Sequence, residues 1–368
     1  MTGVDGVIGT GKIRVLVVDD SAFMRILISD MLNADPAIEV AGVARNGADG
    51  VEKAKALSPD VITMDVEMPE MNGIEAVKRI MAEKPTPVVM VSGVTKKNAD
   101  VTLEALANGA FDFVTKPSGT LSLDIEKVKD ELIAKIKGAS AGKIGAVGRR
   151  RGPAPARVSK ATAAGAGKRS RRVVVIGSST GGPKALDEIF SALPDRGAVA
   201  AGMLVVQHMP PHFTKSLAER LDGHSAVHVR EGEEGDVITD GSAFVAPGGY
   251  HMTVQRGTIH TNKEPPVNAI RPSVDVTMFS AAKTYGPNTV GVLLTGMGKD
   301  GAAGMKAIKA QGGKTIACDE ETSIIFGMPK EAIKLGCVDN VVPLHGIAGA
   351  IMESLGVNQR GNSDECGY

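Results

Sequence analysis

The most constraining feature of this sequence is the alternation of short apolar runs with longer amphipathic segments. In the first third of the chain, the apolar runs are rich in β-branched residues and cover residues 13–18, 39–44, 61–64, 87–91 and 111–114. The segments between them repeat apolar residues at helical spacing, and a last helix is predicted at residues 124–137. Repeated strand–helix units predict a doubly wound α/β domain with a parallel sheet over residues 12–137.

The composition changes sharply at residues 138–172, where Ala, Gly, Lys and Arg dominate and Asp and Glu are absent. No apolar periodicity runs through this stretch, so we predict a basic, flexible linker. Its positive charges fit contact with nucleic acid or an acidic partner as well as a solvated hinge, and we favour the hinge.

After the linker, the alternation resumes and predicts a second α/β domain at residues 173–354. Its expected strands are residues 173–176, 203–207, 289–294 and 315–317. A hairpin that turns at Arg256–Gly257 is predicted between the second and third of these strands. The fold class is therefore α/β, with two doubly wound parallel-sheet domains, a flexible linker and a small antiparallel insertion in the second domain. Residues 355–368 are predicted to form a disordered tail.

Charge and composition narrow the possible functions. Lys and Arg number 42, Asp and Glu number 42, and Trp is absent. No strong field or stacking surface therefore favours nucleic acid or an anionic membrane. The three cysteines include no CxxC pair, which is typical of a reducing compartment. Since no apolar run approaches the roughly 18 residues of a membrane span, we expect a cytoplasmic protein without membrane insertion and without a nucleic-acid partner.

Charged residues follow three of the strands predicted in the first domain. Asp19 and Asp20 end the first strand, Asp65 ends the third, and Lys116 follows the fifth. The carboxyl ends of parallel strands share one edge of the sheet, where ligands bind. Grouped carboxylates repel one another unless a cation neutralises them, and an all-oxygen site suits Mg²⁺. The sequence therefore predicts a magnesium site at this edge.

An aspartate side chain at the same edge of the sheet could accept a phosphoryl group. An Asp beside a metal ion and a lysine can do so because both cations neutralise the incoming oxygens. Ser92, after the fourth strand, is placed to hydrogen-bond that group. The alternative interpretation is that the acidic residues only cap helices, as Asp20 or Ser21 would do for the segment that follows them.

These residues give the first domain a resemblance to a response-regulator receiver. The stretches that resemble one are "VDDSAFMR", "DVEMPEMNG", "VSG" and "FDFVTKP". The resemblance implies that the helix at residues 98–108 transmits the signal. It also implies these roles: phosphorylation at Asp65, Mg²⁺ binding by Asp19, Asp20 and Asp65, phosphoryl contact by Lys116, and switching by Ser92.

The second domain opens with the loop "GSSTGG", between a predicted strand and a helix that begins near Pro183. A phosphate-binding loop needs GxGxxG or GxxxxGK[ST], and this stretch matches neither pattern. It does match G-x-S-x-G, the nucleophile elbow that presents a serine, here Ser179, at the edge of an α/β sheet. An anion-binding loop and a plain tight turn stay open as alternatives.

Two further loops at that edge could complete a hydrolytic site. A serine alcohol needs a base, and the base needs a group that orients it. His208 follows the second predicted strand of this domain, and Asp300 lies in "TGMGKDG" after the third. A backbone amide near Met297 is a candidate oxyanion contact. Taken singly, His208 is more often structural and Asp300 more often a helix N-cap, but together with Ser179 they predict a Ser-His-Asp triad.

The second domain resembles the chemotaxis response-regulator protein-glutamate methylesterases, which are also receptor glutamine deamidases. The stretches behind the resemblance include "IGSSTGGPKAL", "QHMPPHFTKSLAERLD", "LLTGMGKDGAAGM" and "ETSIIFGMPKEAIKLGCVD". The resemblance implies that Ser179 is the nucleophile, His208 the general base and acid, and Asp300 its orienting residue. It further implies that Met297 and Thr180 support the oxyanion, and that this domain needs no cofactor.

The resemblance also implies partners and regulation. The phosphodonor would be a chemotaxis histidine kinase, and the substrate would be methylated cytoplasmic helices of chemoreceptors. Unphosphorylated, the first domain would block the edge that carries Ser179, and phosphorylation would open it. Two other classes are weighed against this one. The first is a receiver-controlled module that binds nucleotides or anions, and the second is a DNA-binding regulator, which would need a helix-turn-helix.

Overall fold

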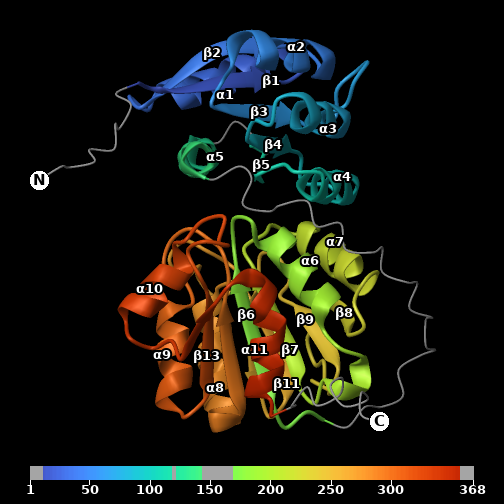
Figure 1. Ribbon diagram of the computed structural model, residues 1–368, viewed down its shortest axis with the longest axis vertical. Coiled ribbons are helices and arrows are strands. Elements are labelled where there is room, and N and C mark those ends of the chain that lie inside the picture. Colours follow the sequence, from blue (N-terminus) through green and yellow to red (C-terminus); the bar gives the residue numbers. More distant parts are fainter. Residues whose placement is uncertain (1–10, 118–121, 143–168, 357–368) are drawn as a thin grey trace, which may run out of the picture. The chain divides into compact units, whose positions relative to one another are not determined.

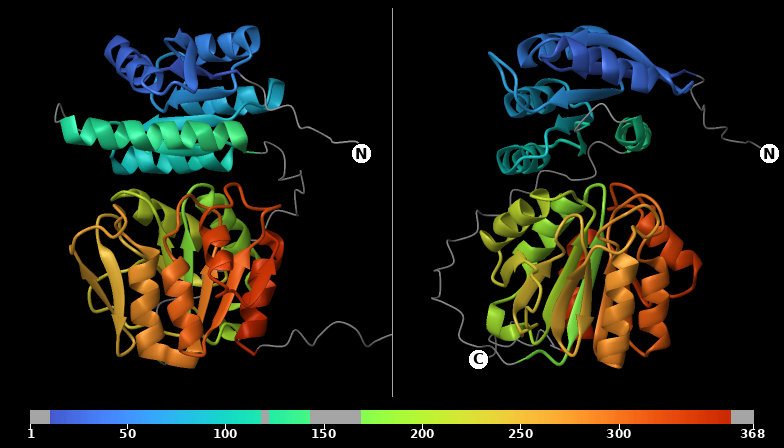
Figure 2. Two further views of the ribbon diagram at one scale, coloured as in Figure 1. Left: turned by 90° about the vertical axis from the view of Figure 1, so that its left-hand side faces the viewer. Right: turned by 180° about the vertical axis from the view of Figure 1, so that it is seen from behind.

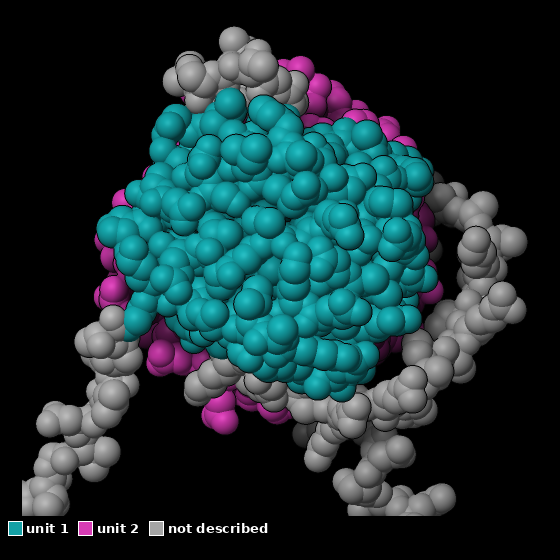
Figure 3. Space-filling view, turned by 90° about the horizontal axis from the view of Figure 1, so that it is seen from above, with its two compact units in different colours: residues 1–144 teal, residues 145–368 magenta. Residues whose placement is uncertain are grey.

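The computed structural model describes residues 11–117, 122–142 and 169–356. The chain divides into two compact units, Met1–Ile144 and Gly145–Tyr368, which Figure 3 colours separately. Most of the predicted linker and nearly all of the predicted tail lie outside the described residues, so both stay predictions. Among the described residues, no helix combines the length and apolar character that crossing a bilayer requires.

Unit 1 is a five-stranded parallel sheet in the order β2-β1-β3-β4-β5. Its strands are β1 Ile13–Val18, β2 Ile38–Ala44, β3 Val61–Asp65, β4 Val88–Ser92 and β5 Asp112–Thr115. The strand order reverses between β1 and β3. Helices cover both faces of the sheet (Figures 1 and 2). On one face lie α1 Ala22–Asn33 and α5 Ser122–Ala141, and on the other lie α2 Gly47–Leu57, α3 Gly73–Glu83 and α4 Lys96–Ala107.

Polar side chains set where the first four helices begin. Ser21, Asn46, Asn72 and Thr95 each accept a hydrogen bond from a backbone N–H in the first turn of α1, α2, α3 and α4. The cap of α1 is thus Ser21, one of the two residues that the sequence offered. The exposed side chain of Asp20 is left for another role.

Unit 2 is a seven-stranded sheet in the order β14-β13-β12-β6-β7-β9-β8, and every neighbouring pair is parallel. Its strands are β6 Val173–Ser178, β7 Gly202–Gln207, β8 His228–Glu231, β9 Ser242–Val245, β12 Thr289–Leu293, β13 Lys314–Cys318 and β14 Asn340–Val342. The predicted strands are β6, β7, β12 and β13, whereas β8, β9 and β14 were missed. β8 and β14 are the edge strands, whose exposed or charged residues form no continuous apolar run.

Helices also cover both faces of the second sheet (Figures 1 and 2). On one face lie α6 Gly182–Ala192, α7 Phe213–Asp222 and α11 Ile347–Ser354, and on the other α8 Val274–Tyr285, α9 Ala302–Ala310 and α10 Met328–Lys334. The central strand β6 is buried along its whole length. Burial on both faces is the reason why it reads as an unbroken apolar run. Both units therefore confirm the predicted α/β class.

The predicted hairpin is present as a separate two-stranded sheet of β10 His251–Gln255 and β11 Thr258–Asn262. Its turn lies at Arg256 and Gly257, where φ is 52° and 72°. These positive values are what a two-residue type I′ turn needs at both of its central positions. The strand β10 packs against α8, which places its first residue near the start of that helix.

The structure differs from the prediction at both ends of the linker. The helix α5 continues to Ala141 rather than ending at residue 137, because Ala139 is buried in the core of unit 1. At the other end, Arg169 forms an antiparallel bridge with Thr239, and the Ser170 N–H donates to the Ile238 carbonyl at 2.9 Å. Residues 169–172, which were predicted to be linker, are therefore bonded to the folded part of unit 2.

The boundary of unit 2 can be tested with Ser170→Ala. The Ser170 hydroxyl donates to Asp240 and accepts from the buried Gly202 N–H at 3.1 Å. Losing these bonds should lower the free energy of unfolding of unit 2 by about 1–3 kcal/mol. Urea denaturation followed by hydrogen-exchange mass spectrometry reads each unit separately. Ser191→Ala, at an exposed serine of α6, is the control, and an unchanged unit 2 transition in Ser170→Ala would contradict the boundary.

Candidate functional site

The predicted acidic site of unit 1 is assembled at the carboxyl edge of its sheet. Asp19 directly follows β1, Asp65 ends β3, and Lys116 directly follows β5. Lys116 Nζ lies 3.0 Å from Asp19 Oδ2 and 2.8 Å from Asp65 Oδ2. Carboxylate oxygens of Asp19, Asp20 and Asp65 lie within 4.8 Å of one another. The site is at the point where the strand order reverses, the usual ligand position in such sheets.

The electrostatics of this cluster fit a divalent cation. Burial raises the pKa of Asp65 to about 6, and repulsion from Asp19 adds to this effect, although Lys116 opposes it. Burial disfavours the charge on Lys116, but Asp65 and Asp19 outweigh it and raise the pKa of the ammonium. The buried Oδ2 of Asp19 accepts no well-oriented hydrogen bond. An all-oxygen cluster with excess negative charge and such an oxygen suits Mg²⁺.

The predicted switch residue is tied to helix α4. Ser92 ends β4, is fully buried, and a hydrogen bond of 2.8 Å joins its Oγ to Thr102 Oγ1 on α4. The Lys116 N–H donates to the Ser92 carbonyl at 2.7 Å. Sequence reasoning missed Thr102, because a threonine inside a helix carries no signal of a tertiary partner. A change at Ser92 can therefore reach α4 through one side-chain contact.

In unit 2, the three predicted catalytic residues lie at one edge of the sheet. Ser179 directly follows β6 and His208 directly follows β7, while Asp300 lies between β12 and α9. Since β6 pairs with both β7 and β12, these loops are neighbours. His208 Nε2 lies 2.8 Å from Asp300 Oδ2. With Nε2 engaged by the carboxylate, Nδ1 is the ring nitrogen left to act as a base.

Asp300 is held as an anion by the N-terminus of α8. Its carboxylate accepts hydrogen bonds from Ser273 Oγ at 2.8 Å, the Val274 N–H at 2.7 Å and the Asp275 N–H at 3.1 Å. Burial opposes its ionisation, but the bonds from His208, Val274 and Ser273 outweigh burial and lower its pKa. Asp300 does not cap α9, which begins after Gly301. The simpler interpretation of Asp300 as a local helix cap is therefore wrong.

The backbone of Ser179 is fixed while its hydroxyl is left unengaged. The Ser179 N–H donates to the Thr295 carbonyl at 3.0 Å, and the Ser179 carbonyl accepts from Gly182 N at 2.7 Å and from Gln207 Nε2 at 3.0 Å. No described residue hydrogen-bonds the Ser179 hydroxyl, and this includes His208. Catalytic hydrogen bonds are often long before substrate binds. The Ser179–His208 contact therefore stays a prediction.

Sequence reasoning missed Gln207, which locks the Ser179 loop. It is buried, accepts from Ser178 Oγ at 2.6 Å and donates to the carbonyl of Ser179. Two glycines permit the close packing around Gln207 and Ser179. A Cβ on Gly182 would lie 1.9 Å from Gln207 Oε1, and one on Gly296 would lie 2.7 Å from the Cβ of Ser179. An amide-bearing residue at the end of a buried strand, just before His208, is the signal that could have revealed it.

The two predicted oxyanion contacts are compatible with that role. Within the described chain, neither the Thr180 N–H nor the Met297 N–H donates a hydrogen bond. Thr180 is fixed through its carbonyl, which accepts from Thr295 Oγ1 at 2.9 Å. Met297 lies between Gly296 and Gly298 in the loop that ends at Asp300. Unengaged amides on two neighbouring loops are what an oxyanion hole requires.

Comparison with known proteins shows which family this chain belongs to. Residues 174–351 match the CheB methylesterase family, and residues 15–125 match the response regulator receiver domain. A protein-glutamate methylesterase/protein-glutamine glutaminase of Pyrococcus horikoshii is 48% identical over 360 residues, which is 96% of each chain. A protein of the same name from Symbiobacterium thermophilum is 48% identical, and the alignment covers 94% of this chain and 97% of that protein. The chain belongs to the CheB methylesterase family.

Membership of the CheB methylesterase family accounts for the order of the two units, with the receiver first and the esterase second. The methylesterase match begins in β6 and ends in α11, so it includes all the loops described above. The roles of Ser179, His208 and Asp300 stay predictions for this chain. The structure contributes the His208–Asp300 pair, the fixed Ser179 backbone and the shared edge.

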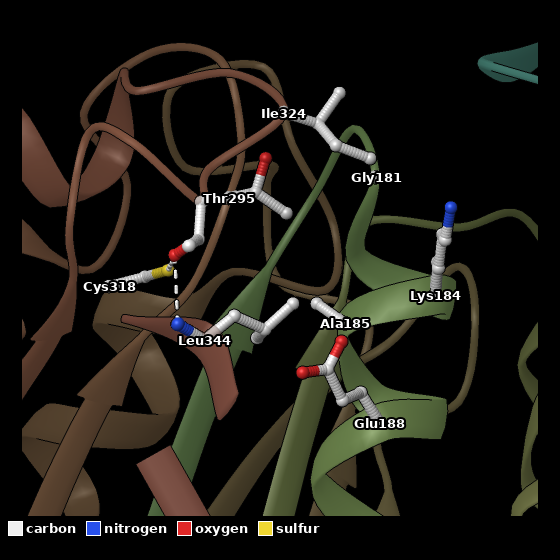
Figure 4. Close-up of a pocket in the computed structure, with 9 residues that line it drawn as sticks. Gly181, Lys184, Ala185, Glu188, Thr295, Cys318, Ile324 and Leu344 are labelled. Atoms are coloured by element: carbon white, nitrogen blue, oxygen red, sulfur yellow. Dashed lines mark hydrogen bonds between the residues drawn. The ribbon is translucent and has the colours of Figure 1, made fainter. Parts of the chain in front are cut away.

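A cavity opens beside the Ser179 loop (Figure 4). It is lined by Gly181, Lys184, Ala185, Glu188, Thr295, Cys318, Thr322, Ile324 and Leu344. Lys184 lies in the first turn of α6, and Figure 4 shows its ammonium pointing away from the Glu188 carboxylate. Burial lowers the pKa of Lys184, although the negative charge of Glu188 opposes this effect, and no described residue forms an ion pair with Lys184. An unpaired cation at a helix N-terminus, where the dipole is already positive, is poised for an anion.

The raised pKa of Asp65 predicts that Asp65→Asn stabilises unit 1 at neutral pH when EDTA removes Mg²⁺. The folded pKa is about 6 and the ordinary value is 3.8, so the folded state binds the proton more tightly. Stability therefore falls as the pH rises through this window, and the full penalty is present at neutral pH. We expect the variant to gain about 1–3 kcal/mol in its free energy of unfolding, since Lys116 also loses a partner.

Urea denaturation of the full chain in EDTA measures this gain. The gain should shrink at acid pH, where Asp65 is protonated, and also when Mg²⁺ stabilises the wild type. Asp60→Asn, at an acidic residue on the opposite edge of the same sheet, is the control. Equal stability of wild type and Asp65→Asn in EDTA at neutral pH would contradict the assignment.

Proposed function

We propose that this chain is a phosphorylation-activated esterase that hydrolyses γ-glutamyl methyl esters on chemoreceptors and deamidates glutamines there. Its relatives carry the name protein-glutamate methylesterase/protein-glutamine glutaminase. The observation that supports the chemistry best is the His208–Asp300 pair beside the Ser179 loop, in which Asp300 is buried and His208 is partly exposed. Such a pair serves a nucleophilic serine and has no use in a loop that only binds phosphate. The nucleotide-binding alternative is therefore not favoured.

The proposed reaction has two halves. Ser179 Oγ attacks the ester carbonyl while His208 Nδ1 takes its proton, and Asp300 stabilises the resulting imidazolium. The amides of Thr180 and Met297 stabilise the oxyanion. The intermediate then expels methoxide, which takes the proton from His208 and leaves as methanol. Water, deprotonated by His208, attacks the acyl-enzyme, and Ser179 recovers its proton as the glutamate carboxylate leaves. With glutamine as substrate, ammonia leaves in the first half.

Unit 1 supplies the regulation in this proposal. Asp65 accepts a phosphoryl group from a chemotaxis histidine kinase, while Lys116 contacts the incoming oxygens. Asp19, Asp20 and Asp65 would hold Mg²⁺, which neutralises charge on the phosphoryl oxygens when bound. Ser92 then moves toward the phosphoryl group and changes its contact with Thr102 on α4. The unphosphorylated receiver blocks the edge that carries Ser179, and phosphorylation favours the open arrangement.

The substrate is a helical segment that projects from a receptor into the cytoplasm, so the proposal places the chain there. Each turnover leaves a carboxylate on that segment. We infer that Lys184, which lies beside the Ser179 loop and forms no ion pair with any described residue, binds acidic residues that flank the ester. A long anionic helix can reach this ammonium from the edge of the sheet, whereas a small neutral ester need not contact it.

Ser179→Ala and Asp300→Asn test the catalytic proposal. Both should lower the rate of methanol release from methylated receptor membranes by about 10³-fold or more. The assay uses the full chain with and without a small phosphodonor, which should stimulate the wild type only. Ser191→Ala, at an exposed serine of the same unit, should keep wild-type activity. Full activity of Ser179→Ala would exclude this serine as the nucleophile.

Lys184→Met tests substrate recognition separately. We expect the KM for methylated receptor to rise about three- to tenfold, with little change in kcat, because one charge-assisted contact is lost. The dependence of KM on salt should also weaken. Lys314→Met removes an exposed lysine at the opposite edge of the sheet and is the matched control. An unchanged KM in Lys184→Met would refute this role while leaving the catalytic proposal intact.

A further inference from the structure

His251 is a buried histidine whose hydrogen bonds, among the described residues, go to neither Ser179 nor His208. It begins β10, is only 1% exposed, and faces the start of α8. Its Nδ1 accepts a hydrogen bond from the Ser273 N–H at 3.3 Å. Its Nε2 lies 3.2 Å from the Pro265 carbonyl. The ring is thus held between two backbone groups.

These two backbone partners fix the protonation of the ring. An N–H can only donate, so Nδ1 of His251 must carry a lone pair. A carbonyl can only accept, so Nε2 must carry the proton. Both conditions are met only by the neutral Nε2–H tautomer. A doubly protonated ring would lose the hydrogen bond from the Ser273 N–H. Its Nδ1–H and the Ser273 N–H would then face each other as two donors, which repel.

The bond to Ser273 completes the cap of α8. Ser273 is the N-cap, and its hydroxyl accepts from the Val276 N–H. In a capping box, a Glu or Gln three residues after the cap reaches back to the N–H of the cap residue. In α8 that position is Val276, which has no acceptor in its side chain. His251 supplies the missing acceptor from a neighbouring strand.

The capped end of α8 is the same element that holds Asp300. The hydroxyl of Ser273 donates to Asp300 Oδ1, and the amides of Val274 and Asp275 donate to the same carboxylate. Asp300 in turn pairs with His208. A continuous set of hydrogen bonds therefore runs from His251 through Ser273 and Asp300 to the proposed general base.

We propose that His251, as the neutral Nε2–H tautomer, is a positioning residue that orients the His208–Asp300 pair through Ser273. This inference rests on the proposed function and adds to it a residue outside the predicted triad. The hydrogen bonds that the structure describes for His251 go to Ser273 and Pro265, so His251 acts through Ser273 and not on the substrate. Its loss should therefore disturb the orientation of the base during the chemical step and leave the binding of receptor helices largely intact.

The test compares His251→Leu with His251→Asn in the full chain. Leucine removes the acceptor, whereas the asparagine Oδ1 occupies about the place of Nδ1 and can still accept from the Ser273 N–H. We expect His251→Leu to lower kcat for methanol release by between about 10- and 100-fold. Its KM should stay within about twofold of the wild type. His251→Asn should recover most of the loss.

His260→Leu is the matched control, because His260 lies on the partner strand β11 with its side chain exposed and paired with Glu234. It should keep the wild-type kcat. A normal kcat in His251→Leu, or a loss that appears only in KM, would overturn the proposal. Equal loss in both His251 variants would also overturn it, since the acceptor would then be irrelevant.

A second measurement does not depend on the leucine variant folding. Nitrogen-15 NMR of histidine-labelled protein, with His251→Asn to assign the resonance among seven histidines, reads the tautomer directly. A protonated Nε2 and an unprotonated Nδ1 at neutral pH support the proposal, and a protonated Nδ1 overturns it. If the wild type releases no methanol, the proposed function fails, and the NMR result alone decides on the capping role of His251.

Discussion

The proposed catalytic site depends on one pairing arrangement, in which β6 is hydrogen-bonded to β7 on one side and to β12 on the other. The register sets Ser178 beside Gln207 and Gly177 beside Leu293. Because all three strands are parallel, the chain leaves each of them at the same edge. The loops that carry Ser179, His208 and Asp300, which are distant in sequence, are thus made neighbours by backbone hydrogen bonds. Gln207 then fixes the serine loop from within the sheet.

Two buried carboxylates show how similar sheets support different chemistry. In unit 1, Asp65 has a raised pKa because burial and Asp19 outweigh the help from Lys116. The ionised form of Asp65 is therefore unfavourable in this site until a cation or a phosphoryl group binds. In unit 2, Asp300 has a lowered pKa because His208 and the first turn of α8 outweigh burial. In the proposed function, the first carboxylate responds to a ligand, and the second, whose lowered pKa favours the anion, orients a base.

The alternation of apolar runs and amphipathic segments was enough to predict the five strands of the first sheet, four of the seven strands of the second, and the hairpin. It also placed the charged residues at strand ends. Strand ends were informative because parallel topology gathers them at one edge, whatever their separation in sequence. The edge strands β8 and β14 escaped because half-exposed strands lack a continuous apolar run. The linker was drawn too long because Ala139 and Ser170 find their partners only in the folded units.

The supporting residues of the site were not predictable for a related reason. Thr102, Gln207 and Ser273 act through partners that lie at least ten residues away in sequence. Taken without its partner, each would pass as an ordinary polar residue of a helix, a strand or a loop. The catalytic candidates carry a chemical signature in the sequence, whereas the partners of Thr102 and Ser273 are recognisable only from the folded geometry. Gln207 is the exception, since its place at the end of a buried strand, just before His208, is a signal in the sequence.

The most direct test of the central claim is to map where a fluorophosphonate probe attaches to the full chain. Such a probe reacts with a serine only when a neighbouring base activates its hydroxyl. Mass spectrometry of the digested protein should find the adduct on Ser179, with labelling strongly slowed in His208→Ala. An adduct on another residue, or labelling of Ser179 that is indifferent to His208, would contradict the account of a serine activated by the His208–Asp300 pair.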